Sequence, residues 1–391
     1  MLMTSADPQP LRCRYFRAGE CRSCALIETP YLQQLAEKQA RCRELLPEVP
    51  EAAWLPPFSG GDRGFRNRAK LVIGGRRGQV TLGILGPDGR GVDLRECAIQ
   101  SPGIAEVIPE LGAFINRLGI APYDVPARRG ELKFVHITEA PADPLAAGGG
   151  ELMLRFVVRS PAARNQARRA LPHLRAAVPR AAVISVNLLP EHKAVLEGEE
   201  EELLLGHTLP MRLGLVTLHL QPQSFFQTNT AVARELYAQV ASWVAEAAPA
   251  SVWDLYCGVG GFALHCAGAG RRVTGVELSP AAVRSARRSA AEAGVDAHFV
   301  AADATEFAQR SAPDAYPGAL IVNPPRRGIG AELAAWIEAS GVPQVIYSSC
   351  NPESLARDLR AMPAYRVNTA RVFDMFPHTR HVEVACLLER H

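Results

Sequence analysis

The sequence has little lysine, few aromatic residues and almost no net charge. Lysine occurs only at positions 38, 70, 133 and 193, aromatic residues make up 6% of the 391 residues, and the formal net charge is +3. A charge this small excludes a uniformly basic surface, so any nucleic-acid partner must be bound by local patches. No apolar run approaches the ~18 residues of a membrane span, and residues 1–17 lack a signal peptide's apolar stretch. We therefore expect a cytoplasmic protein that does not span or bind a membrane.

Cysteine, by contrast, is frequent for a chain without an export signal. There are nine cysteines, an odd number, and disulfide frameworks belong to oxidising compartments. Apolar residues make up 48% and charged residues 21%, so a chain of this length can bury two or three compact cores. The cysteines are therefore expected to serve something other than cross-linking.

We divide the chain into three parts, residues 1–50, 51–220 and 221–391. The first holds three closely spaced cysteines and then a helix over residues 30–46, whose expected apolar stripe is Leu32, Leu35, Ala36, Cys42 and Leu46. In the second part, short apolar runs alternate with Gly and Pro turns, for example at 70–74, 79–85, 132–137, 152–158 and 183–188. This alternation predicts an antiparallel α+β domain.

The third part repeats a strand followed by a helix. Apolar strands at 251–256, 272–277, 298–300, 319–322 and 344–348 alternate with helices, the first two of which begin at Phe262 and Pro280. Such alternation predicts βαβ units, a parallel sheet and an α/β, Rossmann-like domain. Two further strand-like runs, 365–373 and 382–388, are not separated by a helix. We therefore expect a terminal antiparallel hairpin on the parallel sheet.

A glycine-rich turn follows the first of these strands, at Asp254-Leu-Tyr256-Cys-Gly258-Val-Gly260-Gly261-Phe262. Glycines there let the backbone approach a ligand, and the next helix offers free N–H groups. Glu277 ends the second strand, where it can hydrogen-bond a ribose diol, and Asp303 follows the third, where an adenine amino group would lie. The turn alone fits NAD as well as S-adenosylmethionine. The acids at 254 and 303 favour S-adenosylmethionine.

The fourth and fifth strands end in further motifs. Asn323-Pro-Pro is typical of enzymes that methylate the exocyclic nitrogen of adenine or an amide nitrogen, but Arg326 replaces the aromatic residue that stacks on their target. Cys350 follows the fifth strand, at the edge where α/β enzymes bind ligands. Glu383 begins the last strand, where it is either an exposed edge charge or an acid with a partner or a task.

Together these residues supply the parts of one reaction, methylation of a pyrimidine at carbon-5. A thiolate that adds to carbon-6 makes an enolate whose carbon-5 can attack a cationic methyl group, and a base then removes the carbon-5 proton. Cys350 is the candidate nucleophile, Glu383 the candidate base, and the crevice at Gly258 the candidate methyl-donor site. A free thiol has a pKa of about 8.5, so Cys350 needs surroundings that stabilise its thiolate.

The remaining motif is a set of cysteines. Cys13, Cys21 and Cys24 lie close together in a polar segment, and Cys97 follows much later. Zinc ribbons usually contain two Cys-x2-Cys pairs, which this spacing lacks. Three clustered thiols and a distant fourth favour a cubic iron–sulfur cluster, with zinc as the alternative.

These motifs resemble those of the bacterial iron–sulfur uracil-C5 RNA methyltransferases along nearly the whole chain. The resemblance rests on the N-terminal cysteines, Phe65-Arg66-Asn67-Arg68-Ala69-Lys70, Gln223-Ser-Phe-Phe226-Gln227-Thr-Asn229, and residues 254–262, 347–352 and 374–383. Within the family, the chain is most similar to the members that methylate uridine 747 of 23S rRNA. Cys13 lies too near the first residue for the RNA-binding barrel of another 23S rRNA branch, and the tRNA-specific branch lacks the cluster cysteines.

The resemblance also implies roles for individual residues. It implies Cys350 as nucleophile, Glu383 as base, and contacts to S-adenosylmethionine from Gln227, Tyr256, Glu277 and Asn323. It implies a 4Fe–4S cluster on Cys13, Cys21, Cys24 and Cys97, and a helix after the clustered cysteines that packs on the catalytic domain. Many members have Phe at position 256 and Asp at position 323. The implied substrate is a uridine of 23S rRNA, in a loop or flipped from its stack. We expect a monomer.

RNA contacts are less well defined by the sequence. Residues 152–190 contain no acid and seven arginines (Arg155, Arg159, Arg164, Arg168, Arg169, Arg175 and Arg180), whereas six glutamates lie between positions 191 and 202. This segregation predicts either a phosphate-facing surface beside an acidic edge or a solvated arginine-rich helix. Further candidates are Arg66, Arg68, Lys70, Arg128 and Arg129.

Several alternatives remain at this point. The chain could methylate a uridine at another rRNA or tRNA site, or it could be an N6-adenine or amide-nitrogen methyltransferase that uses Asn323-Pro-Pro. A non-enzymatic alternative is an iron–sulfur RNA-binding or sensor protein with an idle cofactor fold.

Overall fold

The computed structural model describes residues 9–142 and 149–391, so the first eight residues of the expected N-terminal part lie outside it. The described chain forms two compact units. The first unit contains residues 25–61 and 212–391 with the described residues up to 11, and the second contains residues 12–24 and 62–211. The helix that follows the clustered cysteines therefore belongs to the unit of the C-terminal sheet. No helix in the described ranges is long and apolar enough to cross a bilayer.

The first unit is built on a seven-stranded sheet of order β12-β11-β10-β13-β14-β16-β15. Its parallel strands are β10 (Ser251–Leu255), β11 (Arg272–Glu277), β12 (Ala297–Ala301), β13 (Ala319–Val322) and β14 (Gln344–Ser349). β15 (Tyr365–Phe373) and β16 (Glu383–Arg390) form an antiparallel hairpin, and β16 also pairs antiparallel with β14. The predicted parallel sheet and its terminal hairpin are confirmed. The strand order reverses between β10 and β13, which is where open α/β sheets bind ligands.

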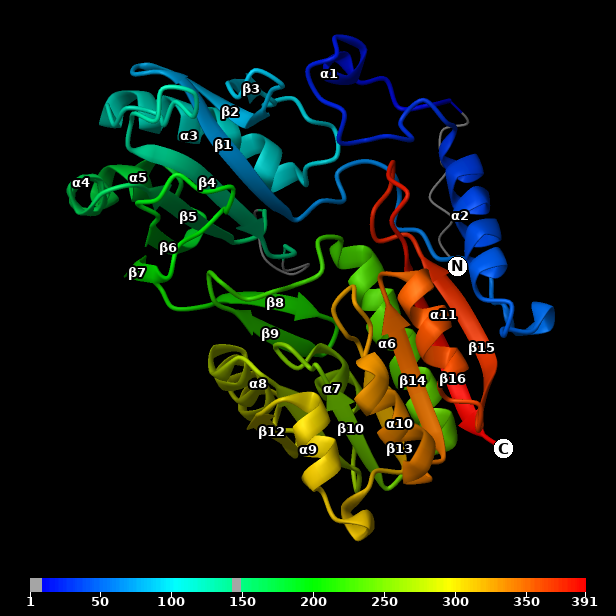
Figure 1. Ribbon diagram of the computed structural model, residues 1–391. Helices are drawn as coiled ribbons and strands as arrows, with labels where there is room; N and C mark the ends of the chain where they lie inside the picture. Colours follow the sequence, from blue (N-terminus) through cyan, green and yellow to red (C-terminus); the bar gives the residue numbers. More distant parts are fainter. Residues whose placement is uncertain (1–8, 143–148) are drawn as a thin grey trace. The chain divides into compact units, whose positions relative to one another are not determined.

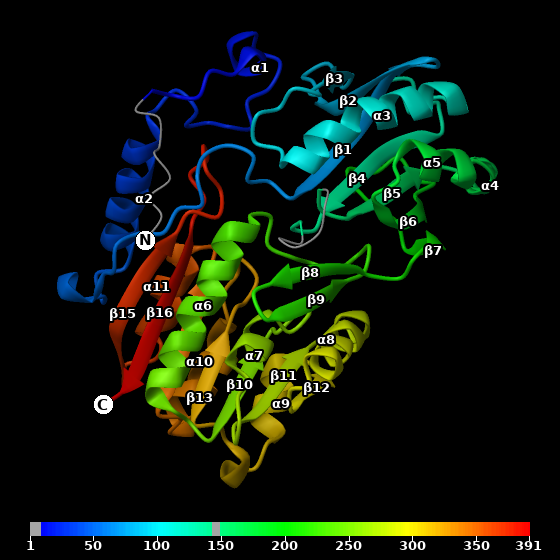
Figure 2. The same cartoon turned by 180° about the vertical axis from the view of Figure 1, so that it is seen from behind.

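Helices cover both faces of this sheet, as the two opposite views show (Figures 1 and 2). One face carries α6 (Thr230–Ala247) and α7 (Gly261–Cys266), and the other carries α9 (Ala304–Arg310), α10 (Gly330–Ser340) and α11 (Pro352–Arg360). α8 (Pro280–Ala293) joins β11 to β12, with a short 3-10 helix at Pro313–Ala315 before β13. Because both faces are covered, β13 and β14 are buried along their whole length and read as continuous apolar runs.

Helix α2 (Tyr31–Leu45) packs in the same unit, beside β15 and α11. Its buried side chains are those of Tyr31, Gln34, Lys38 and Cys42. The predicted helix is confirmed, but the predicted apolar stripe is wrong at Leu32, which is 55% exposed, and at Ala36, which is exposed as well. Cys42 and Leu46 are buried as predicted, and Leu35 is half-buried. The helix buries a polar face because it packs on the polar segment between β15 and β16. After a 3-10 turn (Glu51–Ala53), the chain runs along the edge of β15.

The second unit contains another seven-stranded sheet, of order β3-β2-β1-β4-β5-β6-β7. Its strands are β1 (Arg68–Arg76), β2 (Gln79–Leu85), β3 (Gly91–Asp93), β4 (Leu132–Glu139), β5 (Leu152–Val158), β6 (Ala181–Leu188) and β7 (Glu200–Leu205). All neighbours are antiparallel except β5 and β6, which are joined by α4 (Pro161–Arg169) and α5 (Leu171–Ala177). Helix α3 (Pro102–Leu118) packs on β2 and β4, and α1 (Arg14–Arg17) lies in the cysteine segment. The α+β prediction is confirmed, with one parallel pair added.

A two-stranded ribbon, β8 (Leu209–Leu213) and β9 (Val216–Leu220), lies along the chain where the second unit ends and the first resumes. The resemblance implies that residues 1–50 are an iron–sulfur segment with its helix, residues 51–220 an RNA-binding domain that adds Cys97, and residues 221–391 the catalytic domain. This functional division stays a prediction.

Candidate active site

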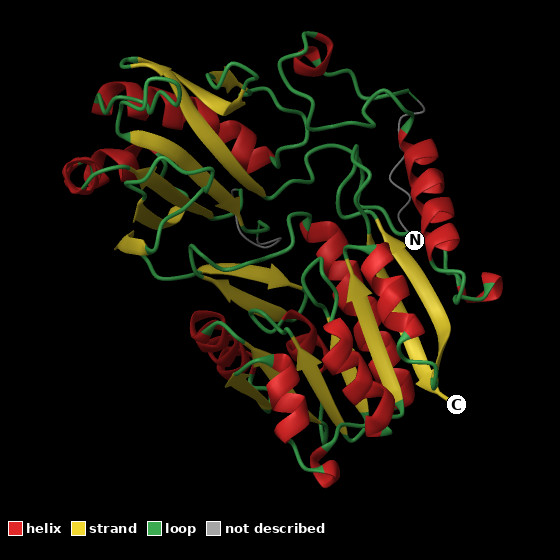
Figure 3. Ribbon diagram, viewed as in Figure 1, coloured by secondary structure: helices red, strands yellow, loops and turns green. Residues whose placement is uncertain are grey.

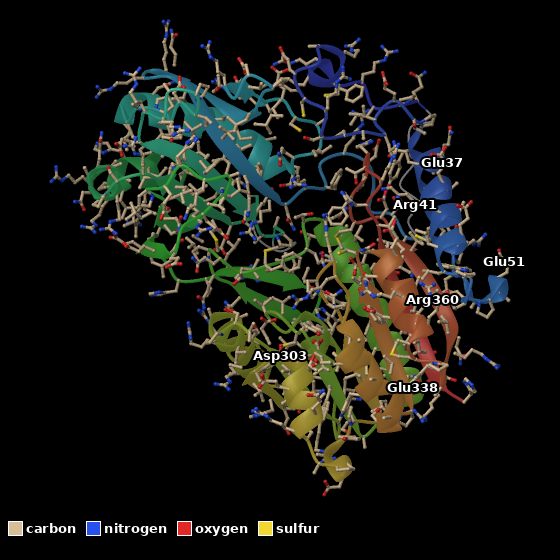
Figure 4. The ribbon with its side chains drawn as sticks, in the orientation of Figure 1. Glu37, Arg41, Glu51, Asp303, Glu338 and Arg360 are labelled. Atoms are coloured by element: carbon tan, nitrogen blue, oxygen red, sulfur yellow. The ribbon has the colours of Figure 1, made fainter. Side chains whose placement is uncertain are left out.

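Several of the candidate cofactor residues lie at the ends of three adjacent strands of the first unit. Because β10, β11 and β12 are parallel neighbours, Tyr256, Glu277 and Asp303 lie at one edge of the sheet. Glu277 accepts hydrogen bonds from the N–H of Gly258 (3.1 Å) and of Ser279 (2.9 Å), so it braces the glycine-rich turn. Asp303 lies at the start of α9 (Figure 4). The pKa of Tyr256 is raised first by the burial of Tyr256 and then by the charge of Asp303. The sequence candidates are therefore neighbours in space.

The turn after β10 has an unusual backbone. Tyr256 has φ of +66°, Gly258 of +55° and Gly260 of +87°. The left-handed region costs a non-glycine residue roughly 1 kcal/mol, and such residues concentrate at ligand sites. A Cβ added at Gly258 would meet nothing within 4 Å, so the space at this glycine is open to a ligand.

Asp254 lies buried beneath the same turn. Its Oδ2 accepts a hydrogen bond from the N–H of Ala263 (2.9 Å), whereas its Oδ1 has no partner among the described residues. Burial raises the pKa of Asp254 to about 8. A buried acceptor without a donor is costly, and a cationic ammonium group from a ligand would satisfy it. This carboxylate therefore fits the methionine end of S-adenosylmethionine.

The two candidate catalytic residues meet at the ends of two paired strands. Ser349 of β14 pairs with Val384 of β16, so Cys350 and Glu383 occupy the next positions on these strands. The loop that precedes Glu383 is drawn at the end of the sheet toward which β14 points (Figure 3). Burial, and then the Glu383 charge, raise the pKa of Cys350. Residues 33 positions apart in the sequence are thus brought together by β-pairing.

Glu383 is a buried acid and not an exposed edge charge. Its side chain is 2% exposed, and its Oε1 accepts hydrogen bonds from Ser348 Oγ (2.5 Å) and Asn323 Nδ2 (3.1 Å). Burial raises the pKa of Glu383 to about 7, and the two hydrogen bonds oppose this rise. A carboxyl group that titrates near neutral pH is suited to accept a proton from a substrate.

Asn323 is directed toward this base. Its Nδ2 donates to Oε1 of Glu383 and to the carbonyl of Ser348, both at 3.1 Å. The contact of Asn323 with the cofactor, which the resemblance implies, stays a prediction. The sequence does not predict the hydrogen bond from Asn323 to Glu383. No local pattern indicates that the residue after β13 and the first residue of β16 lie next to each other.

The surroundings of Cys350 include one positive group. Cys350 is half-buried and lies just before α11, whose N-cap is Asn351. Arg326 opposes the raised pKa of Cys350 through its charge and a hydrogen bond. In the sequence alone, Arg326 stands out only as a departure from the Asn-Pro-Pro pattern. Arg326 directly follows the Asn-Pro-Pro motif, which comes after β13, and β13 is the neighbour of β14. This position was the signal that Arg326 could lie near Cys350.

Helix α2 supports the loop that leads to Glu383. Lys38 Nζ lies 2.6 Å from Asp374 Oδ1, with both side chains buried, and it also donates to the carbonyl of Phe376 (3.0 Å). Tyr31 donates its hydroxyl to Asp374 Oδ2 (2.7 Å). Gln34 Oε1 accepts from the N–H of His378 (3.0 Å), which has φ of +64°. The expected packing of this helix on the catalytic domain is confirmed.

The motif before α6 contributes two side chains of opposite character. Gln227 is buried, whereas Phe225 is 74% exposed. Asn229 caps α6 by accepting from the N–H of Val232 (3.3 Å), which fixes the end of this segment. An exposed aromatic ring in such a segment is of the kind that stacks on an unstacked base. Sequence reasoning did not single out Phe225.

The four candidate cluster cysteines all lie in the second unit and are free and half-buried. Burial, and then Cys97, Cys21 and Cys13 in that order, raise the pKa of Cys24 to about 12. Among the described residues, no group of three or more His, Cys, Asp or Glu side chains is assembled to hold a metal ion. The thiols are therefore near enough to influence one another without being placed as metal ligands.

Part of the arginine-rich stretch is paired with the glutamate run that follows it. Arg155 is buried and pairs with Glu197 and Glu201, and Arg168 pairs with Glu202 (2.7 Å). Arg164 also lies near this glutamate run. A phosphate-facing surface apart from the glutamates is therefore wrong for these three arginines, because β7 and the loop before it return the glutamates to β5, β6 and α4. Arg169 and Arg175 are exposed, and RNA contacts by them stay a prediction.

Comparison with known proteins agrees with this geometry. The family model of tRNA (uracil-5-)-methyltransferases matches residues 201–391. The chain is 48% identical over 380 residues to the 23S rRNA (uracil(747)-C(5))-methyltransferase RlmC of Shewanella amazonensis, covering 97% of each chain. It is 47% identical over 385 residues to that of Halothiobacillus neapolitanus, covering 97% of this chain and 100% of the relative.

A solved structure is also similar. The tRNA (uracil-54, C5)-methyltransferase of Pyrococcus abyssi, in complex with S-adenosyl-L-homocysteine, matches with a TM-score of 0.75 and 26% identity, over 93% of this chain and 85% of that one. The fold is thus that of an S-adenosylmethionine-dependent methyltransferase, as the sequence predicts. With identity near one half over almost the whole length, the chain belongs to the family of 23S rRNA (uracil(747)-C(5))-methyltransferases.

Proposed function

We propose that the protein transfers a methyl group from S-adenosylmethionine to carbon-5 of a uridine in 23S rRNA. The meeting of Cys350 and Glu383 at the ends of β14 and β16 carries this proposal, because the reaction needs a thiol and a base side by side. The relatives named for uridine 747 support the choice of substrate.

The first step belongs to Cys350. Its thiolate adds to carbon-6 of the uracil, forming a C–S bond and moving the electron pair of the 5,6 double bond to carbon-5 and the oxygen on carbon-4. Arg326 and the N-terminus of α11 favour the thiolate, because both place positive charge near the sulfur.

The second half of the reaction belongs to Glu383. When bound, S-adenosylmethionine supplies an electrophilic methyl group, which carbon-5 accepts. Glu383 then takes the carbon-5 proton, the 5,6 double bond re-forms, and the C–S bond breaks to return the thiolate to Cys350. The buried carboxylate can accept this proton at neutral pH because its pKa lies near 7.

The cofactor site consists of the turn at Gly258 and the residues around it. We assign Gln227, Tyr256, Glu277 and Asp303 to S-adenosylmethionine, with Asp254 holding its ammonium group, and we retain Asn323 as a candidate contact. Phe225 is assigned to stacking on an RNA base, because its ring is exposed. Such stacking requires an unstacked base, so we keep a loop uridine as the target. A cytoplasmic monomer remains part of the proposal.

We further propose a 4Fe–4S cluster on Cys13, Cys21, Cys24 and Cys97. Two observations support it: the four thiols lie in one unit, and three of them act on the pKa of Cys24. When bound, the cluster would link the start of the second unit to the segment that holds Cys97. Zinc remains the alternative ion.

The test of the function uses Cys350→Ala. Wild-type protein should release tritium from 5-tritiated uridine in unmethylated 23S rRNA, and the variant should release none. Cys266→Ala, which removes a buried thiol on α7, should retain activity. Substantial methyl transfer by Cys350→Ala would favour nitrogen methylation, and no transfer by the wild type would favour a non-enzymatic RNA-binding protein. Mass mapping of 23S rRNA from a deletion strain identifies the nucleotide.

A further inference from the structure

A positively charged cavity opens beside Cys350 within the first unit. Its volume is about 270 Å³, large compared with the ~30 Å³ that one water molecule occupies. No acidic residue lines it, and its basic lining residues are Lys38, Arg41, Arg326, Arg380 and His381. Helix α2, the turn after β13 and the loop before β16 each contribute at least one of them. The cavity therefore joins three separate segments around the nucleophile.

The positive charges of these residues are neutralised to different extents by nearby acidic side chains. Lys38 is compensated by its buried pair with Asp374. Arg41 lies 3.5 Å from Glu353, but both side chains are largely exposed, and such a pair contributes little in water. Arg326 and Arg380 are exposed as well. An anion in the cavity would thus meet guanidinium groups that are free to turn toward it.

His381 gives an independent sign of positive potential. Burial lowers the pKa of His381, and the charges of Arg326, Lys38 and Arg41 lower it further. Three cations, two from helix α2 and one from the turn after β13, therefore act on one imidazole that lines the same cavity. A concave site with one sign of charge attracts the opposite charge.

We propose that this cavity binds a backbone phosphate of the RNA beside the target uridine, with Arg41 and Arg380 as its ligands. The inference rests on the proposed function, because a uracil held at Cys350 carries its flanking phosphates next to the sulfur. A guanidinium matches a phosphate with two parallel hydrogen bonds. The carboxylate of S-adenosylmethionine is a poorer occupant, since the glycine-rich turn follows β10, separated from β14 by β13.

The proposal gives helix α2 a direct part in substrate binding. Arg41 projects from α2, and Figure 4 labels it together with Glu37 and Glu51 on this part of the chain and Arg360 on α11. Lys38, one turn earlier, fastens the helix to the loop that carries Arg380. The buried Lys38–Asp374 pair therefore fixes the positions of Arg41 and Arg380 relative to each other.

The first experiment measures binding of an unmethylated 23S rRNA fragment as a function of salt. Arg41→Gln and Arg380→Gln should each weaken binding about tenfold, the expected value of one charge-assisted contact. Each should also reduce the slope of log Kd against log salt by about 0.7. Arg43→Gln is the matched control, because it removes an equal charge from α2 outside the cavity, where Arg43 pairs with Glu51. Affinity for S-adenosylmethionine should not change.

The second experiment locates the phosphate. A fragment with an uncharged methylphosphonate on either side of the target uridine should bind wild-type protein about tenfold more weakly at one of the two positions. At that position Arg41→Gln should lose nothing further. The inference would be overturned if both arginine variants bound RNA with wild-type affinity and salt slope. It would also be overturned if the methylphosphonate weakened binding equally in the wild type and in Arg41→Gln. Absence of methyl transfer by the wild type would instead refute the proposed function.

Discussion

The amide Nδ2 of Asn323 lies 3.1 Å from Oε1 of Glu383 and donates a hydrogen bond to it. Because the amide can only donate through this nitrogen, the bond favours the ionised carboxylate and opposes the effect of burial on its pKa. The same nitrogen donates to the carbonyl of Ser348, so the amide orientation is fixed by a second acceptor. We therefore propose that Asn323 acts on the reaction through Glu383, as a positioning residue.

Asn323→Asp should move the pH dependence of the reaction. A base acts when ionised, so the rate should rise with pH through the Glu383 pKa near 7. Ionisation of the Cys350 thiol, whose pKa is raised by burial, should add a second rise at higher pH. The new carboxylate adds like charge and removes the donor, which raises the pKa of Glu383 and shifts the first rising limb by about one pH unit to higher pH. Single-turnover tritium release between pH 5 and about 9 measures the shift.

Asn368→Asp is the control for this experiment. Asn368 lies on β15 and donates to Glu389 in an exposed amide–carboxylate pair of the same kind. Its pH profile should match that of the wild type. An unchanged profile in Asn323→Asp would show that Asn323 does not set the ionisation of the base.

Glu383→Gln should trap the reaction after methyl addition. Without a base, the carbon-5 proton stays in place, so the C–S bond to Cys350 cannot break. A covalent protein–RNA adduct should accumulate on a denaturing gel, with turnover reduced at least about 100-fold. Glu389→Gln, on the same strand but exposed, should show neither effect. Normal turnover without an adduct in Glu383→Gln would assign proton removal to another group.

Lys38→Met should destabilise the protein strongly. The change leaves Asp374 buried without its cation, which costs about 3–5 kcal/mol in the free energy of unfolding. Urea unfolding followed by fluorescence measures the loss. Adding Asp374→Asn should recover part of it, and Lys193→Met, at an exposed site, should have little effect. Equal stability of Lys38→Met and the wild type would mean that the pair is not formed in solution.

Cys24→Ser should remove the proposed 4Fe–4S cluster. Anaerobically purified wild-type protein should contain iron and sulfide and absorb broadly in the visible range, and the variant should lose all three signals. Cys266→Ala should keep them. Zinc without visible absorbance in the wild type would favour the alternative ion, and no metal in either would refute the assignment.

Much of the fold could be predicted because its signals are local. The parallel strands of the first unit are continuous apolar runs, since helices cover both faces, and the missing helix between β15 and β16 indicates a hairpin. Gly258 and Cys350 follow strand ends, so their common edge also follows from the strand pattern. The reaction then follows from the residue types that a uracil C5 methylation needs.

Other features depend on which distant segments pack together. Helix α2 buries Gln34 and Lys38 instead of Leu32, because its partner is the polar loop at Asp374. The charges of Arg155 and Glu201 are separate in the sequence and neutralise each other in the sheet.

The sequence by itself determined the family and the strand pattern, and it predicted the thiol and the acid of the site, because each is written in a short motif. Only the tertiary structure decided that Asn323 donates to Glu383 and that Arg41 reaches the cavity at Cys350. The physical reason is that strand order and helix packing set these contacts, and both are long-range properties of the folded chain.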